Sequence, residues 1–235
     1  MSAGGLQTGW VQKALDLWVG CHCCGSECLR CYARTLLIRK GRNPDLIVRG
    51  PVSDWLRVRT FKSGEWVMLC PSSDLFLSEA ERWIPAVFDM ISSRPDLVFI
   101  ALTKRLENAR HFLPSKPFPN LWLGTSAGTQ ESLDQRVPML YKVPATRYII
   151  SAQPLLEPID VRPYLRNPKL KLVVTGCEMG KDARFCDKSW LTDVRKQCRS
   201  GGVECFITRH REGTQLVNHR ARDGRRSHNP LNTTY

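Results

Sequence analysis

Short apolar runs alternate with longer amphipathic segments along most of the chain. The apolar runs, five or six residues each, predict buried strands; they lie at 15–20, 66–70, 97–102, 121–125, 147–151, 170–175 and 203–208. The longer segments predict helices at 32–41, 78–92, 104–112, 130–141, 161–165 and 188–200. Ser78 is the expected N-cap of the second helix, and Gly201 and Gly202 are expected to end the last one.

This alternation of strands and helices is typical of right-handed βαβ units, which build a parallel sheet. About seven strands are one fewer than a closed eight-stranded barrel needs. The expected fold is therefore α/β, a partial (βα)6–7 TIM-like barrel, whose active site lies at the carboxyl ends of the strands. Neither an internal repeat nor a low-complexity linker divides the chain. We expect one domain over 1–208 and a basic tail over 209–235.

The bulk composition is ordinary for a soluble globular protein, with 42% hydrophobic and 24% charged residues among 235. The longest apolar runs are too short to cross a membrane, and the start of the sequence lacks the pattern of a secretory signal. The expected location is the cytoplasm, where thiols stay reduced. Ten cysteines in such a compartment favour metal binding or catalysis over disulfides.

Positive charge is in excess and gathers near the end of the sequence. The net charge is +13, and residues 209–235 hold six arginines and three histidines against two acidic residues. Such a segment attracts phosphates through counterion release, which makes a nucleic acid the expected partner and a membrane an unexpected one. A solvated tail without a specific partner is the alternative.

Five of the ten cysteines fall within “LWVGCHCCGSECLRCYA” at 17–33. Cys24-x3-Cys28-x2-Cys31 is the spacing of three thiolates that bind three irons of a [4Fe–4S] cluster and leave the fourth iron open. Cys21-x6-Cys28-x2-Cys31 is a second register with the same last two ligands. Two C-x2-C pairs also suggest structural zinc, although the spacer between them is short for a zinc site. The dispersed cysteines are expected to be small buried side chains; they are Cys70, Cys177, Cys186, Cys198 and Cys205.

Six segments, in one order along about 170 residues, carry a resemblance to a known family. The first, “WVGCHCCGSECLRCYA” at 18–33, matches W-x-G-C, six residues, then C-x2-C-Y-A. The others are “SSDLF” at 72–76, “LTKR” at 102–105, “LWLGTS” at 121–126, “PATRYIISAQPLLEPIDV” at 144–161 and “VVTGCEMGKDAR” at 173–184. In these segments the chain resembles the radical S-adenosylmethionine (SAM) superfamily, and within it the compact phage and bacterial three-cysteine proteins related to spore photoproduct lyase.

The chain departs from that family at three points. Cys23 and Cys24 are additional, so the family register favours Cys21 as the first ligand, whereas the common superfamily spacing favours Cys24. Gln153 stands where the family usually has a glutamate, and “FITRHREG” at 206–213 replaces a closing aromatic–Lys–Gln–Trp segment. The last two departures suggest a specialised substrate pocket.

The resemblance implies a [4Fe–4S] cluster held by Cys28 and Cys31 with Cys21 or Cys24, and S-adenosyl-L-methionine bound at the open iron. It also implies an external electron donor, such as flavodoxin or ferredoxin, and cleavage of SAM to a 5′-deoxyadenosyl radical. Polar residues beside the last cysteine and at strand ends are the expected cofactor-binding residues; they are Tyr32, Ser72, Ser73, Asp74, Lys104, Ser126 and Glu178. A core position for Tyr32 and an ion pair between Glu178 and Arg184 are alternatives. No catalytic residue is assigned.

One activity described for the family rearranges 5-N-α-glycinylthymidine, in which glycine is joined through nitrogen to thymine, to the carbon-linked isomer. The resemblance therefore implies an isomerase that hypermodifies thymidine in phage DNA, which evades host restriction, in the host cytoplasm. A base in a duplex has to be flipped out to reach a buried cluster. The alternatives are a radical SAM lyase that repairs damaged DNA, an RNA-modifying enzyme, and a zinc-stabilised nucleic-acid-binding module without enzymatic activity.

Overall fold

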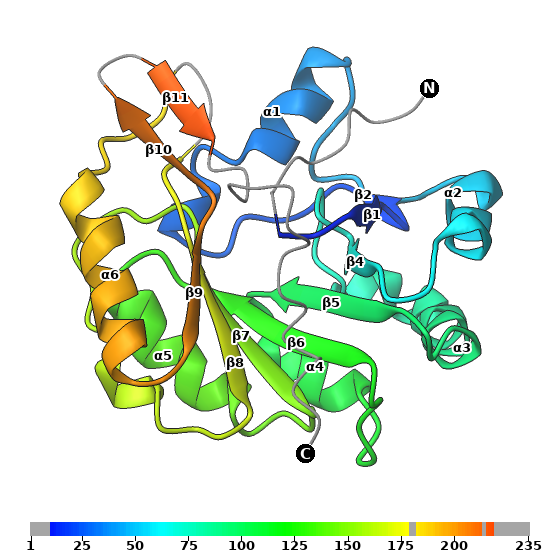
Figure 1. Ribbon diagram of the computed structural model, residues 1–235. Coiled ribbons are helices and arrows are strands. Elements are labelled where there is room, and N and C mark those ends of the chain that lie inside the picture. Colours follow the sequence, from blue (N-terminus) through cyan, green and yellow to red (C-terminus); the bar gives the residue numbers. More distant parts are fainter. Residues whose placement is uncertain (1–9, 179–181, 213–214, 219–235) are drawn as a thin grey trace.

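A curled, seven-stranded parallel sheet forms the centre of the molecule (Figure 1). The computed structural model describes residues 10–178, 182–212 and 215–218. The strand order is β1-β4-β5-β6-β7-β8-β9, and each neighbouring pair is parallel. The strands are β1 (Lys13–Leu15), β4 (Trp66–Leu69), β5 (Val98–Thr103), β6 (Leu121–Ser126), β7 (Arg147–Ala152), β8 (Leu170–Thr175) and β9 (Glu204–Ile207). The expected α/β partial barrel is confirmed.

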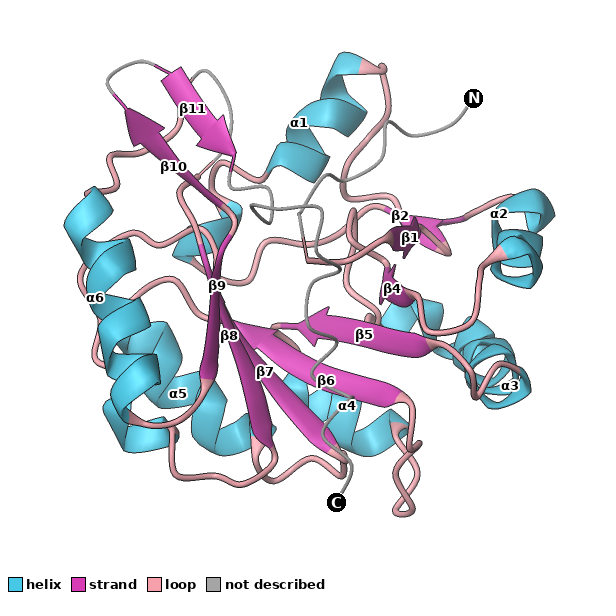
Figure 2. Ribbon diagram, viewed as in Figure 1, coloured by secondary structure: helices cyan, strands magenta, loops and turns pink. Residues whose placement is uncertain are grey.

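Helices cover the convex face of the sheet (Figure 2). They are α3 (Ile84–Ser93), α4 (Leu106–Phe112), α5 (Gln130–Leu140) and α6 (Lys188–Ser200). Within β5, Phe99 and Ala101 belong to the core beneath these helices, whereas Val98 and Ile100 belong to a second core on the concave face. Because both faces of the sheet are buried, its strands are unbroken apolar runs in the sequence.

Tryptophans fill the amino-terminal part of the concave face. Trp66 begins β4 and Trp122 lies near the start of β6, and their ring centroids are 4.7 Å apart. Trp10 joins the same buried cluster. Further along β6, Gly124 leaves no room for a side chain, because a Cβ there would lie 2.5 Å from Leu102 Cδ2. The cavity of the molecule lies beyond this packing, at the carboxyl ends of the strands.

The expected strand at 15–20 is divided in the structure, so the prediction of one continuous strand was wrong. β1 ends early, and β2 (Trp18–Val19) pairs antiparallel with β3 (Val48–Arg49) in a separate sheet. Asp16 lies between β1 and β2. Its carboxylate accepts hydrogen bonds of 2.9 Å from both the backbone N–H and the hydroxyl of Ser72. These bonds hold Asp16 at the end of β4, where the chain leaves the barrel.

Most expected helices agree with the structure within two residues at either end. α1 (Tyr32–Arg39) follows the last clustered cysteine, and α4 and α5 occupy the expected segments. α6 has the expected bounds: the side chain of Asp187 caps it by accepting a 2.7 Å hydrogen bond from Ser189 N, and Gly201 follows its last residue.

Two other expected helices are shorter than predicted. The segment Ser78–Trp83 is a 3-10 helix, and the α-helix α3 starts only after it. Ser78 is therefore not an α-helical N-cap; its hydroxyl lies 3.2 Å from Asn108 Nδ2. The expected helix at 161–165 is one 3-10 turn. The sequence did not predict α2 (Val52–Leu56), which follows β3.

Beyond β9 the chain forms an antiparallel hairpin of β10 (Arg209–Glu212) and β11 (Gln215–Asn218). Regular structure thus extends into the segment expected to be a basic tail. Residues 219–235 of that tail lie outside the described residues, and a domain boundary at 208 stays a prediction. None of the helices in the described ranges is long and apolar enough to cross a lipid bilayer.

Candidate active site

A cavity opens at the carboxyl ends of the strands, beneath the segment that carries the cysteines. Its empty space, counted with the open mouth, is about 1310 Å3. All the predicted cluster ligands and cofactor-binding residues line it; they are Cys21, Cys24, Cys28, Cys31, Tyr32, Ser72, Ser73, Asp74, Lys104, Ser126 and Glu178. The fold therefore brings side chains from several strand ends to one place.

The cysteine loop, residues 20–31, runs from β2 to α1. Cys28 ends a short 3-10 turn within it, and Cys31 is the N-cap residue of α1. The sulfurs of Cys24 and Cys28 lie 4.0 Å apart. The hydrogen bond from Cys24 and the positive charge of Lys104 lower the pKa of the Cys28 thiol to about 5, although burial opposes this shift. This lowered pKa favours the thiolate form of Cys28, which is the form that binds metals.

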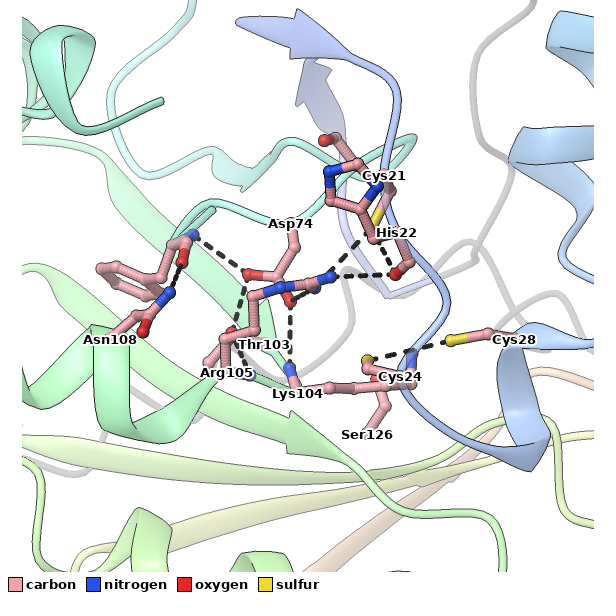
Figure 3. A network of polar contacts seen from close by, with 12 residues as sticks. Cys21, His22, Cys24, Cys28, Asp74, Thr103, Lys104, Arg105, Asn108 and Ser126 are labelled. Atoms are coloured by element: carbon pink, nitrogen blue, oxygen red, sulfur yellow. Dashed lines mark hydrogen bonds and ion pairs between the residues drawn. The ribbon is translucent and has the colours of Figure 1, made fainter. Parts of the chain in front are cut away.

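A buried carboxylate positions an arginine against the first half of the cysteine loop (Figure 3). Asp74, which follows β4, accepts a 3.0 Å hydrogen bond from the backbone N–H of Lys104 and lies 3.1 Å from Arg105 Nη1. Arg105 donates to the carbonyl of His22 at 2.8 Å and to the sulfur of Cys21 at 3.7 Å. Both oxygens of Asp74 are engaged by protein donors. Asp74 therefore acts on the loop through Arg105.

A second buried ion pair holds the other half of the cysteine loop. Glu27 is 4% exposed, and its Oε1 lies 2.9 Å from Arg136 Nη1 on α5. The same oxygen accepts the backbone N–H of Gly128 at 3.1 Å, and Arg136 donates to the carbonyl of Ser126 at 2.6 Å. Burial alone would raise the pKa of Glu27, but backbone hydrogen bonds and the charge of Arg136 hold it below the usual value.

A third ion pair joins the loop to the end of β8. The backbone and Nε of Arg184 each donate to Glu178 Oε2 at 2.9 Å, and Arg184 Nη1 donates to the carbonyl of Ser26 at 2.9 Å. Burial would raise the pKa of Glu178, but these hydrogen bonds hold it below its usual value. Glu178 is therefore paired with Arg184, as the sequence alternative proposed, while it also lines the cavity.

The polar groups expected to bind a cofactor differ in whether the protein already engages them. The hydroxyl of Tyr32 donates to a backbone carbonyl at 2.7 Å, that of Ser73 donates to another, and that of Ser72 donates to a carboxylate. Within the part of the chain that the structure describes, no hydrogen bond or ion pair engages the ammonium of Lys104 or the hydroxyl of Ser126. These two groups are available to a ligand.

Sequence reasoning missed the residues that fix the cysteine loop. Glu27 lies among the cysteines, and its partner Arg136 is 109 positions away. An acidic residue inside a cysteine cluster is a local signal, but nothing local identifies the arginine. Arg34 was missed in the same way: it donates to the carbonyl of Cys21 and lies 2.7 Å from Asp45 Oδ1.

The donor set fits an iron–sulfur cluster. Four cysteine sulfurs from one loop line a single cavity, and thiolates are the ligands that such clusters use. Among the described residues, no group of three or more His, Cys, Asp or Glu side chains could hold one metal ion. An iron–sulfur cluster does not require such a group, because each of its thiolates binds a different iron.

Two solved structures of spore photoproduct lyase are similar to the chain. One is a cysteine-to-alanine variant, with 13% sequence identity, a TM-score of 0.52, and coverage of 83% of this chain and 76% of the other. The second is a complex with the dinucleoside spore photoproduct, with 12% identity, a TM-score of 0.51, and coverage of 87% and 81%. At this level of identity the likeness establishes the fold, which agrees with the expected partial barrel.

A comparison with curated proteins gave no match. A family model does match, over residues 7–229, which is nearly the whole chain and includes every residue of the candidate site. The chain belongs to the family described as “Protein of unknown function (DUF5131)”.

Proposed function

We propose that the protein is a radical SAM enzyme that rearranges a modified thymine in DNA, from N-linked to C-linked glycinylthymidine. Cys28 and Cys31, with one of Cys21 and Cys24, would hold a [4Fe–4S] cluster. One observation carries the proposal: the four cysteines and the seven polar residues that the resemblance singled out line the same cavity at the strand ends. The spore photoproduct lyase fold supports it.

In this proposal the chain's own residues orient the cofactors and exclude water from the cavity. When bound, the cluster and SAM supply one-electron chemistry that abstracts hydrogen from carbon. The three ion pairs hold the cysteine loop from α5 and from residues that follow β4, β5 and β8, so the cysteines are preorganised. Trp10, Met68 and Leu102 give the cavity an apolar part, which excludes water from a reactive intermediate.

The charge of the cavity favours a substrate that carries a carboxylate. The ammonium of Lys104 is available there to an acidic group of SAM or of the substrate. Gln153, which replaces the usual glutamate, also lines the cavity, and its amide donates to the hydroxyl of Thr208. A glutamate at this position would repel the glycine carboxylate, whereas an amide does not. The nitrogen and the carboxylate of the glycine unit both stabilise a radical at its α-carbon. The C–H bond at that carbon is therefore weakened.

The net charge of the protein supports the proposal that its substrate is a thymine base within DNA. A chain with +13 net charge gains sequence-independent affinity from phosphates. Such affinity would suit an isomerase that acts on a base within DNA, because phosphate contacts do not depend on the base sequence.

A repair lyase is the second candidate function. The observation that favours it is the structural neighbour bound to the dinucleoside spore photoproduct. The two functions differ in substrate. Only the isomerase acts on glycine-modified thymine, and only the lyase restores thymine from irradiated DNA.

The test is an anaerobic assay of the cluster-loaded protein with SAM and dithionite on both kinds of DNA. Nucleosides are then separated and identified by mass spectrometry. We expect glycinylthymidine to convert to an isomer of equal mass and different retention, and we expect irradiated DNA to stay unchanged. Cys31→Ala is the control and should convert neither. Conversion of irradiated DNA alone would refute the isomerase and support the lyase. A colourless protein that contains zinc would refute both functions.

A further inference from the structure

Two polar side chains at the carboxyl end of β7 face the cavity. Ser151 lies in β7 and Gln153 follows it, and both line the cavity. They share a face of the strand with Ile149, which belongs to the concave core, because alternate residues of a strand point the same way. Ser151 is 2% exposed, and none of the described residues engages its hydroxyl. This end of β7 therefore offers polar groups to a ligand in the cavity.

The hydroxyl of Thr208 fixes the orientation of the Gln153 amide. Thr208 follows β9, is buried, and donates its hydroxyl proton to the carbonyl of Thr175 at 3.3 Å. A hydroxyl has one proton, so its oxygen is left to accept, and it accepts a hydrogen bond from Nε2 of Gln153. The amide nitrogen therefore lies toward β9, which β8 separates from β7 (Figure 1).

The rest of the Gln153 amide is available to a ligand. An amide nitrogen carries two protons and an amide oxygen accepts. Only one of these protons is used by Thr208, and within the described ranges of the chain no group engages Oε1. The amide thus presents an acceptor beside a donor, in an order that Thr208 sets.

Backbone contacts hold the segment that carries Gln153. Leu156 donates its backbone N–H to the carbonyl of Gly128 at 2.9 Å. Gly128 packs so tightly here that a Cβ would lie 1.9 Å from the carbonyl oxygen of Pro154. The backbone N–H of Gly128 also donates to Glu27 of the cysteine loop at 3.1 Å. The amide is therefore held in a fixed position relative to the cysteine loop, as a recognition group needs to be.

The order of donor and acceptor selects the ligand. A ligand that binds both groups has an N–H beside a carbonyl in one plane, which is the pattern of a cyclic imide. Thymine and uracil carry this pattern on their Watson–Crick edge, where N3–H lies between two carbonyls. Cytosine carries an acceptor nitrogen beside an amino group, so the Gln153 amide would have to turn and lose its bond to Thr208. A carboxylate or a phosphate diester offers no proton to Oε1.

We propose that Gln153, oriented by Thr208, selects an imide-bearing base by binding its N3–H and one adjacent carbonyl, while the hydroxyl of Ser151 donates to the other carbonyl. This inference rests on the proposed function for the class of substrate, a pyrimidine base, and adds the residues that distinguish thymine from cytosine. Enzymes that flip a base read it through the same edge. C5 is not part of that edge, so a substituent there is left free to react. Trp10 and Leu102, which also line the cavity, are suited to the apolar faces of a planar ring.

The test compares the binding of two single-stranded oligonucleotides by the full-length, cluster-loaded protein. They differ in one base, which is N-linked glycinylthymine in one and cytosine with the same C5 substituent in the other. Because they share every phosphate, the ratio of their dissociation constants isolates the edge of the base. The variants are Gln153→Met, which removes both hydrogen-bonding groups, and Thr208→Val, which removes the hydroxyl that orients the amide. Gln135→Met, at an exposed position of α5, is the matched control.

We expect the native chain to bind the thymine oligonucleotide about thirtyfold more tightly, because cytosine leaves polar groups of the cavity unpaired. Gln153→Met should lose this preference through weaker thymine binding. Thr208→Val should lose it mainly through tighter cytosine binding, because its amide is free to turn. Gln135→Met should keep the preference, and the iron content of all variants should match that of the native chain.

Equal affinity of the native chain for the two oligonucleotides would overturn the inference. An unchanged preference in Gln153→Met, or an equal loss of preference in Gln135→Met, would do the same. Conversion of the thymine oligonucleotide is measured separately in the same preparations. A native chain that prefers this oligonucleotide but leaves it unconverted would refute the isomerase and support the selection of the base, so the two failures are distinguishable.

Discussion

Arg105 places a guanidinium N–H 3.7 Å from the sulfur of Cys21, and the same nitrogen lies 3.1 Å from the carboxylate of Asp74. The carboxylate fixes the direction of the arginine, and the arginine presents a charged donor to the cysteine. A hydrogen bond to a ligand sulfur stabilises the reduced, more negative form of a cluster. Arg105 is therefore a positioning residue that is expected to act on the cluster through Cys21.

Removing that donor should lower the reduction potential of the cluster. For Arg105→Gln we expect a more negative midpoint in a redox titration followed by electron paramagnetic resonance, with iron content preserved. Arg34→Gln is the control, because Arg34 contacts the carbonyl of Cys21 and not its sulfur. Equal midpoint potentials for the native chain and Arg105→Gln would show that this hydrogen bond does not affect the reduction potential of the cluster.

The buried pair of Glu27 and Arg136 should matter far more for stability than an exposed pair of similar geometry. Arg136→Leu leaves the Glu27 carboxylate buried without its cation, which should lower the free energy of unfolding by about 3 kcal/mol. Arg162→Leu breaks the exposed pair with Asp160, which has a distance of 2.7 Å. This change should alter the free energy of unfolding little. Denaturant unfolding of both variants measures the difference. Similar losses in the two would contradict the role given to Glu27.

Stability should fall in acid, partly through Glu178. Its folded-state pKa lies below the ordinary 4.5 because Arg184 outweighs the effect of burial. A lowered pKa stabilises the folded state above pH 4.5, and this contribution is lost as the pH falls through the folded value. We expect the pH dependence of the unfolding free energy below pH 5 to be shallower in Glu178→Gln. An unchanged slope would mean that the ion pair does not survive in solution.

The basic segment that follows the hairpin should contribute to DNA affinity. Truncation after Asn218 keeps β10 and β11 and removes four arginines and one acidic residue. Because each neutralised phosphate adds to the salt dependence, the truncated protein should bind DNA more weakly and with a smaller salt slope. SAM cleavage should be largely retained. Identical salt titrations of the full-length and truncated proteins would support the alternative that this segment is a solvated tail without a specific partner.

The sheet was predictable because its strands are buried on both faces. Runs such as the one at 97–102 therefore stand out without any knowledge of their neighbours. The clustering of Asp74, Lys104 and Ser126 was also predictable, since residues that follow parallel strands meet at one rim.

Other features depend on partners that are distant in the sequence. The division of the first strand depends on Asp16, which is bound by Ser72, 56 positions away. Likewise, nothing near Asp74 in the sequence shows that both of its oxygens are engaged by protein donors. Its assignment as a cofactor-binding residue stays a prediction. The ion pairs around the cysteine loop could not be predicted from the sequence, because only the fold brings their partners together.

The choice between Cys21 and Cys24 as the first ligand now has a structural argument. Cys21 is partly buried and receives hydrogen bonds at its sulfur and carbonyl, whereas Cys24 is exposed. We expect Cys21→Ala, Cys28→Ala and Cys31→Ala to lose the cluster, and Cys24→Ala to retain it. A full cluster in both Cys21→Ala and Cys24→Ala would refute the three-thiolate scheme.

The most direct test of the whole account is the iron and acid-labile sulfide content of the native chain, purified and reconstituted without oxygen. A [4Fe–4S] cluster predicts about four irons and four sulfides per chain, with the brown colour of such clusters. Material that contains neither iron nor sulfide, or that binds zinc in their place, would contradict the radical mechanism.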